Sequence, residues 1–174
     1  RRLLTVEDTA ELQVYHDHWL RRETRRERPD GTPEVDMNDC LKSSLRMRPD
    51  RIIVGEVRGP EAATLLTAMN TGHDGSFGSL HANTAQETVT RMINPPMLVP
   101  PIMLTGLDLI IIQARLHVNG KTARKITEVA EIAGMEGTKP RLNIIWKYNP
   151  ANERIDETGL SLIHISEPTR HSSI

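Results

Sequence analysis

Apolar residues alternate between two kinds of pattern over the first half of the chain. Residues 3–6 and 52–57 are short, nearly continuous apolar runs, typical of strands buried on both faces of a parallel sheet. Residues 77–80 predict a further strand. Apolar side chains recur at helical spacing in three other segments, namely 35–47, 60–70 and 85–93. This alternation predicts an α/β domain with a mostly parallel sheet between helices.

Prolines and polar residues indicate where the helices begin and end. Asp36 is placed to cap the first helix, and Pro49 follows its end. Pro60 opens the second helix, because proline is tolerated in a first helical turn. A further short helical stretch is expected over residues 100–107.

The pattern of apolar residues changes again after residue 107. Residues 108–118, 125–132 and 142–148 have the composition of strands, with turn signals at 119–120 and 134–140. Consecutive strands joined by short turns pair in antiparallel fashion. We therefore expect a peripheral antiparallel addition to the α/β domain.

The chain divides into three parts. Residues 1–150 are expected to form a partial α/β domain, because the first strand begins at once without a preceding loop or cap, and residues 151–159 form a terminal segment. Residues 160–170 resemble a translated sequencing adapter that recurs as a false ending on gene fragments. We expect residues 160–174 to be a non-native tail and the whole chain to be a fragment.

Composition narrows the classes of partner. The 22 Lys and Arg residues balance 23 Asp and Glu residues, which predicts no attachment of the whole chain to nucleic acid or anionic lipid. Cys40 is the only cysteine, so no intrachain disulfide can form and a reducing compartment is expected. Residues 21–28 hold five arginines and two glutamates, followed by turn residues at 29–33. This segment is expected to be an exposed, basic loop.

Acidic residues follow two of the predicted strands. Hydrolysis of a nucleoside triphosphate needs a positioned water, a divalent cation and positive charge around the phosphoryl group. Glu56 ends its strand where an acid can hold magnesium or its waters, although an ordinary surface acid fits the same pattern. Glu7 and Asp8 point to opposite faces, so one could orient the water while the other binds metal or caps a helix from Thr9. An N-cap and a solvated acid are the alternative.

Basic residues supply the other candidates. His81 follows three glycines between 72 and 78, a spacing that permits tight turns and close approach of a ligand. It could contact a γ-phosphate, or it could be structural or simply exposed. Arg21 and Arg25 could bind phosphate through their planar guanidinium groups. Their intermixture with Glu23 and Glu27 is equally consistent with a salt-bridged surface.

One phosphate-binding signal is rejected. Gly120-Lys121-Thr122 resembles the end of a phosphate-binding loop, but Arg115 occupies the position where that loop requires a glycine. The three residues also lie at a turn between strands. No other Gly-Lys-Ser/Thr occurs, so the chain lacks the loop that cradles the phosphates.

Three ordered segments, 4–9, 45–56 and 71–83, resemble the secretion-superfamily traffic ATPases. These proteins power type II and type IV secretion, conjugation, type IV and Tad pili, and archaeal pili or archaella. The resemblance covers about residues 1–148 and makes residues 5–11 the acidic box, 52–56 an atypical Walker B strand and 71–83 the histidine box. Segment 71–83 looks closer to the Tad-like and archaeal pilus branch.

The resemblance implies a partial RecA-like P-loop NTPase domain that uses ATP and Mg and assembles as a homo-hexamer. It implies water activation by Glu7, magnesium binding by Glu56 and a place near the γ-phosphate for His81. Arg21 and Arg25 match arginines of the family between the acidic box and the Walker B strand, and with Arg48 they are the nucleotide-binding candidates. From its position after the first strand, Asp8 is a second candidate magnesium ligand beside Glu56.

The leading hypothesis is a fragment of a hexameric ATPase that powers pilus or archaellum assembly, or secretion of protein or DNA. Its parent would be cytoplasmic, peripheral at the membrane and docked on an inner-membrane platform protein, without direct nucleic-acid binding. The expected amino-terminal domain and Walker A segment are absent, which leaves activity of the fragment open. The alternative is a non-catalytic RecA-like scaffold or regulatory module. A nucleic-acid motor is disfavoured because aromatic residues are 3% of the chain.

Overall fold

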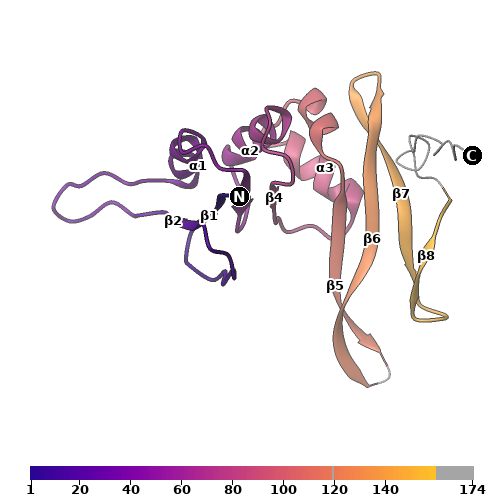
Figure 1. Ribbon diagram of the computed structural model, residues 1–174. Helices are drawn as coiled ribbons and strands as arrows, with labels where there is room; N and C mark the ends of the chain where they lie inside the picture. The colour runs from indigo at the N-terminus through magenta and orange to yellow at the C-terminus, as the bar shows by residue number, and fades with distance from the viewer. Residues whose placement is uncertain (119, 160–174) are drawn as a thin grey trace, which may run out of the picture.

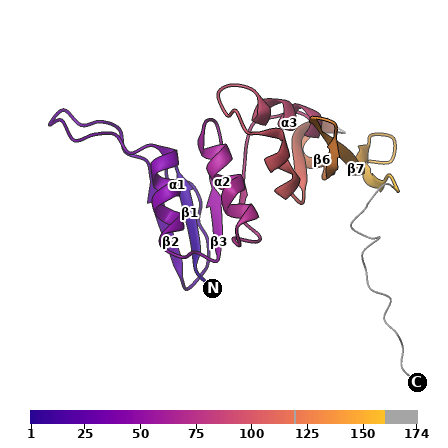
Figure 2. The same cartoon turned by 90° about the horizontal axis from the view of Figure 1, so that it is seen from above.

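The computed structural model describes residues 1–118 and 120–159, which form two four-stranded sheets lying side by side (Figures 1 and 2). One sheet is parallel, with strand order β2-β1-β3-β4, and the other has the order β5-β6-β7-β8. Both sheets contribute to one hydrophobic core, which includes Leu4, Ile52 and Ile112. The proposed non-native tail, 160–174, lies outside the described residues.

The parallel sheet brings the ends of its strands to one edge. Its strands are β1 (Leu3–Glu7), β2 (Trp19–Glu23), β3 (Arg51–Val54) and β4 (Phe77–Gly78). In register, Val6 lies beside Val54, and Glu7 lies beside Glu23. Ligands of open parallel sheets bind at the carboxyl ends of the strands. The acids that follow β1 and β3 are therefore placed at the same edge.

Two helices pack against this sheet and against each other. They are α1 (Met37–Leu45) and α2 (Glu61–Asn70), and the fully buried Leu41 and Leu66 carry them into the core. Asp36 caps α1 as predicted, since its Oδ1 accepts a hydrogen bond from the Asp39 amide at 2.7 Å. Helix α3 (Ala85–Ile93) and the 3₁₀ helix η1 (Pro101–Gly106) follow, and both contact the second sheet.

The second sheet is antiparallel, as predicted. Its strands are β5 (Ile110–Val118), β6 (Lys121–Glu136), β7 (Lys139–Asn149) and β8 (Arg154–Glu157). Strand β6 begins earlier and ends later than expected, so its turn to β7 is confined to Gly137 and Thr138. Gly137 has a φ of +61°, which a glycine adopts without strain. Strand β8 was not predicted.

The basic segment differs from its prediction as a loop. Residues 19–23 form β2, because their backbone pairs in parallel with β1 although their side chains are mostly charged. The chain then leaves the sheet as an arm, residues 24–36, that projects from the body of the molecule (Figures 1 and 2). Arg25 and Val35 exchange two backbone hydrogen bonds of 2.9 and 2.8 Å at its base. Within residues 1–118 and 120–159, no helix is long and apolar enough to cross a membrane.

Candidate functional site

Glu7 is a buried carboxylate at the end of β1, with only 3% of its surface exposed. Its Oε1 accepts hydrogen bonds from the backbone amides of Glu11 at 3.0 Å and Leu12 at 2.8 Å. These bonds wrap residues 9–12 around the carboxylate, so the helix considered from Thr9 onward does not form. The second oxygen, Oε2, accepts no hydrogen bond from the described residues.

Arg21 lies beside Glu7 on the neighbouring strand β2. Its Nε is 3.8 Å from Glu7 Oε2, its guanidinium stacks 4.4 Å from the centre of the Trp19 ring, and it donates to the Leu12 carbonyl. Trp19 is itself fixed by a 3.0 Å hydrogen bond from its indole to Thr5 Oγ1. Arg21 thus supplies positive charge near a carboxylate oxygen that lacks a donor.

Asp8 has surroundings unlike those of Glu7, as the alternation of adjacent residues predicts. It is exposed, and its Oδ1 accepts a 2.6 Å hydrogen bond from the Thr24 hydroxyl at the base of the arm. Asp8 also lines two cavities that Glu56 and Arg58 line. Because Glu7 is buried and Asp8 exposed, the two acids can serve different tasks.

Glu56 follows β3 and is held by two basic side chains. Its Oε2 pairs with Arg58, and its Oε1 lies 3.1 Å from Nε2 of His81. The hydrogen bond from Arg58, with smaller contributions from the charges of Arg58 and His81, holds the pKa of Glu56 below its ordinary value. The carboxylate is therefore ionised at neutral pH, as a metal ligand must be.

Hydrogen bonds of the backbone and of two serine side chains bring the Glu56 and His81 segments together. The Val57 amide donates to the Ser79 carbonyl at 2.7 Å, and the Ser79 hydroxyl donates to the Gly55 carbonyl. Further back, Ser76 Oγ accepts from the Ile52 amide at 2.9 Å. These contacts join the end of β3 to the histidine-containing loop. His81 itself is 86% exposed, which leaves its ring accessible to a ligand.

A cavity of about 190 Å³ joins the two acidic segments. Its lining includes Glu7, Asp8, Glu56 and Arg58. No group of three His, Cys, Asp or Glu side chains in the described part of the chain is arranged as a ready-made metal site. Magnesium suits this donor set nonetheless, because it is bound by one or two carboxylates and completes its shell with water and phosphate oxygens. The carboxylates that line this cavity could supply such ligands to magnesium.

Arg25 and Arg48 lie apart from this cavity. Arg25 donates to the Pro33 carbonyl at 3.1 Å and so holds the two sides of the arm together. Arg48 is exposed and lines a different cavity with Arg2 and Trp19, where β1 and β2 begin. Their roles toward nucleotide stay predictions.

Arg58 is a residue of the site that the sequence reasoning missed. It contacts Glu56 directly and also borders the cavities on either side of it. Its position two residues after Glu56, on an extended segment, was a usable signal, because such residues point to the same side.

Gly55 leaves little room beside Glu7. A Cβ at this position would lie 3.0 Å from Glu7 Cγ and 3.6 Å from the Val6 carbonyl oxygen. We expect Gly55→Ala to displace the carboxylate and lower kcat for ATP hydrolysis by about tenfold in the intact protein, because small misplacements at a reacting centre are costly. Steady-state kinetics would measure this, with thermal unfolding as the control for folding. A wild-type kcat would mean that Glu7 can move aside without consequence.

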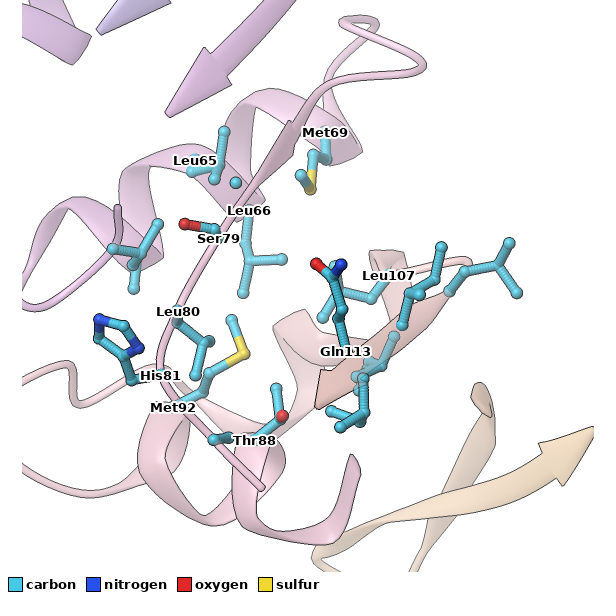
Figure 3. Close-up of a pocket in the computed structure, with 18 residues that line it drawn as sticks. Leu65, Leu66, Met69, Ser79, Leu80, His81, Thr88, Met92, Leu107 and Gln113 are labelled. Atoms are coloured by element: carbon cyan, nitrogen blue, oxygen red, sulfur yellow. The ribbon is translucent and has the colours of Figure 1, made fainter. Parts of the chain in front are cut away.

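An apolar cleft of about 370 Å³ separates the two sheets (Figure 3). One wall comes from α2 and the segment around Ser79 and Leu80, and the other from Leu107 and the start of β5. Strands β4 and β5 are each the last strand of their sheet on the side that borders the cleft. His81 lines the cleft as well as contacting Glu56, so the cleft adjoins the acidic cavity.

Comparison with known proteins agrees with this geometry. Residues 1–142 match the family model described as "Type II/IV secretion system protein". An uncharacterised protein of Methanocaldococcus jannaschii is 34% identical over 167 residues, which cover 93% of this chain and 60% of that protein. The VirB11 ATPase of the Brucella suis type IV secretion system, solved with sulphate, superposes with a TM-score of 0.59 at 27% identity over 75% of this chain. The pilus retraction motor PilT with bound ADP has a TM-score of 0.52 at 30% identity over 82%.

These structures confirm the predicted fold class, a partial α/β domain with an antiparallel addition. The chain spans 40% of the VirB11 chain and 38% of the PilT chain, so it corresponds to a part of each. The family match covers most of the described residues, including every acidic and basic residue of the cavity. The chain belongs to the type II/IV secretion system protein family.

Proposed function

We propose that the chain is part of a motor that hydrolyses ATP to drive pilus or archaellum assembly, or secretion of protein or DNA. The observation that carries this proposal is the cavity between β1 and β3, which is lined by the buried acid Glu7 and by Glu56. The similarity to the VirB11 ATPase and to the ADP-bound pilus retraction motor PilT supports the same activity here.

The surroundings of each residue suggest a different role in hydrolysis. Glu7 Oε2 would accept a hydrogen bond from the attacking water and take its proton. Arg21 would supply positive charge beside this carboxylate. Glu56, with Asp8 beside it, would hold magnesium, and His81 would contact the γ-phosphate from its exposed position. Magnesium bound here would neutralise charge on the transferring phosphoryl group.

We infer that the cleft between β4 and β5 receives the strand that carries the phosphate-binding loop. Two strand edges border this apolar cleft, and no Gly-x-x-x-x-Gly-Lys-Ser/Thr occurs in the sequence. A strand inserted there would complete one continuous sheet and end near His81 and Glu56. That strand would come from another part of the intact protein. In this proposal residues 1–150 are a partial ATPase domain, residues 151–159 are a terminal segment, and residues 160–174 are a non-native tail.

The family supports further proposals about the intact protein. It would act as a homo-hexamer in the cytoplasm, peripheral at the membrane, on a platform protein of the inner membrane. Arg25 and Arg48, which lie outside the cavity, would then reach nucleotide held by a neighbouring copy. Direct binding of nucleic acid is not expected, because the net charge is −1.

The test is to recover the genomic reading frame across both ends and assay its full-length product for magnesium-dependent ATP hydrolysis. We expect turnover, a phosphate-binding loop encoded upstream and a different ending after about Gly159. A frame that starts near Arg1, ends at Ile174 and shows no turnover would overturn the proposal and favour a non-catalytic scaffold.

A further inference from the structure

Glu61 is a buried carboxylate that belongs to none of the catalytic roles above. It is the first residue of α2, and only 5% of its surface is exposed. Its Oε1 accepts two backbone hydrogen bonds, from the Arg58 amide at 2.6 Å and the Gly59 amide at 2.7 Å. A carboxylate is rarely buried unless its charge is compensated, and here two amides and the start of a helix compensate it.

This arrangement differs from ordinary helix capping. A capping side chain usually precedes the helix and accepts from amides inside it, whereas Pro60 at the N-cap makes no such bond. Glu61 instead reaches backward, to the segment that joins β3 to α2. Its bonds therefore fix the backbone just after Glu56.

The segment is held from two sides. The Val57 amide is bound to the Ser79 carbonyl at 2.7 Å, and the next two amides are bound to Glu61. A Cβ on Gly59 would lie 3.1 Å from Glu61 Oε2, so glycine allows the close approach. With its amide fixed, Arg58 is in position to pair with Glu56.

We propose that Glu61 is a positioning residue that sets the direction of Glu56 and Arg58 toward the cavity. The backbone restraint stands on the geometry alone. Its consequence for magnesium rests on the proposed function, through Glu56. Two measurements separate these steps.

The first measurement is amide hydrogen exchange in the 174-residue chain, which requires no nucleotide. Glu61→Ala should accelerate exchange of the Arg58 and Gly59 amides by about tenfold or more, because charge-assisted hydrogen bonds to the backbone are lost. Glu61→Gln retains an oxygen acceptor and should stay much closer to wild type. The Val57 amide, bound to Ser79, is the internal control. Unchanged Arg58 and Gly59 rates in Glu61→Ala, or an equal acceleration of all three amides, would overturn the restraint.

The second measurement is Mn²⁺ binding to the nucleotide-loaded intact protein, followed by electron paramagnetic resonance. Glu61→Ala should weaken Mn²⁺ binding by about 10- to 100-fold, as loss of a residue that orients a metal ligand does, and Glu61→Gln should restore most of it. Unchanged Mn²⁺ affinity in Glu61→Ala would overturn the positioning role. A wild-type protein that binds no nucleotide would instead overturn the proposed function, while the exchange result would still decide the restraint.

Discussion

Replacing Glu7 with glutamine in the intact protein should lower kcat for ATP hydrolysis by about 100- to 10,000-fold, the usual contribution of a general base. Glutamine has the same shape and can still accept from the Glu11 and Leu12 amides, so the loop around it should persist. What it loses is the anionic Oε2, which accepts no hydrogen bond among the described residues. Affinity for ATP should change little, because the role proposed for Glu7 is to act on the attacking water and not on the nucleotide.

Single-turnover kinetics and equilibrium binding of ATP would test whether kcat falls while ATP affinity is retained. Glu27→Gln is the control, since Glu27 is an exposed acid on the arm and is not among the residues that line the acidic cavity. Its kcat should stay close to wild type. A Glu7→Gln protein with near-normal kcat, or one whose loss appears only in ATP affinity, would remove Glu7 from water activation.

Replacing Glu56 with glutamine should lower magnesium-dependent hydrolysis by at least about 100-fold, because a bound metal contributes several kcal/mol to the transition state and each 1.4 kcal/mol is a factor of ten. The neutral amide also loses its charge attraction to Arg58. The low pKa of Glu56, caused chiefly by the hydrogen bond from Arg58, means that wild type retains this charge throughout neutral pH.

The measurement is the rate of hydrolysis as a function of magnesium concentration. In Glu56→Gln the apparent magnesium constant should rise as the rate falls. Glu34→Gln is the control, because Glu34 is an exposed acid that lines a neighbouring cavity with Glu56. Equal hydrolysis by wild type and Glu56→Gln would show that the Walker B assignment is wrong.

The strands and helices that carry the site were predictable because their own side chains enter the core. Residues 52–54, for example, are all buried, so their apolar run indicates their structure directly. Strand β2 was not predictable in this way, since three of its five residues are charged and its pairing depends on β1. Its sequence resembles a loop, and only the register with a partner makes it a strand.

The sequence indicated which residues belong to the candidate site, but it did not indicate which of them contact one another. Glu7 and Glu56 end strands, and this position indicates a ligand edge without further information. The contact between His81 and Glu56 depends on the path of the chain from α2 to β4, which includes turns at Gly72 and Gly75 with positive φ. Glu61 was hidden because an acid in a first helical turn ordinarily indicates only a favourable charge at the helix end.

The cleft between β4 and β5 has a consequence for anyone who prepares this chain. Edge strands that lack a neighbour pair readily with strands of other molecules, and exposed apolar side chains beside the edge strengthen such pairing. The Ile111 side chain on β5 is already more than half exposed at this edge. Oligomers of the isolated chain would therefore reflect association through the edges of β4 and β5, and they should not be taken for the proposed hexamer.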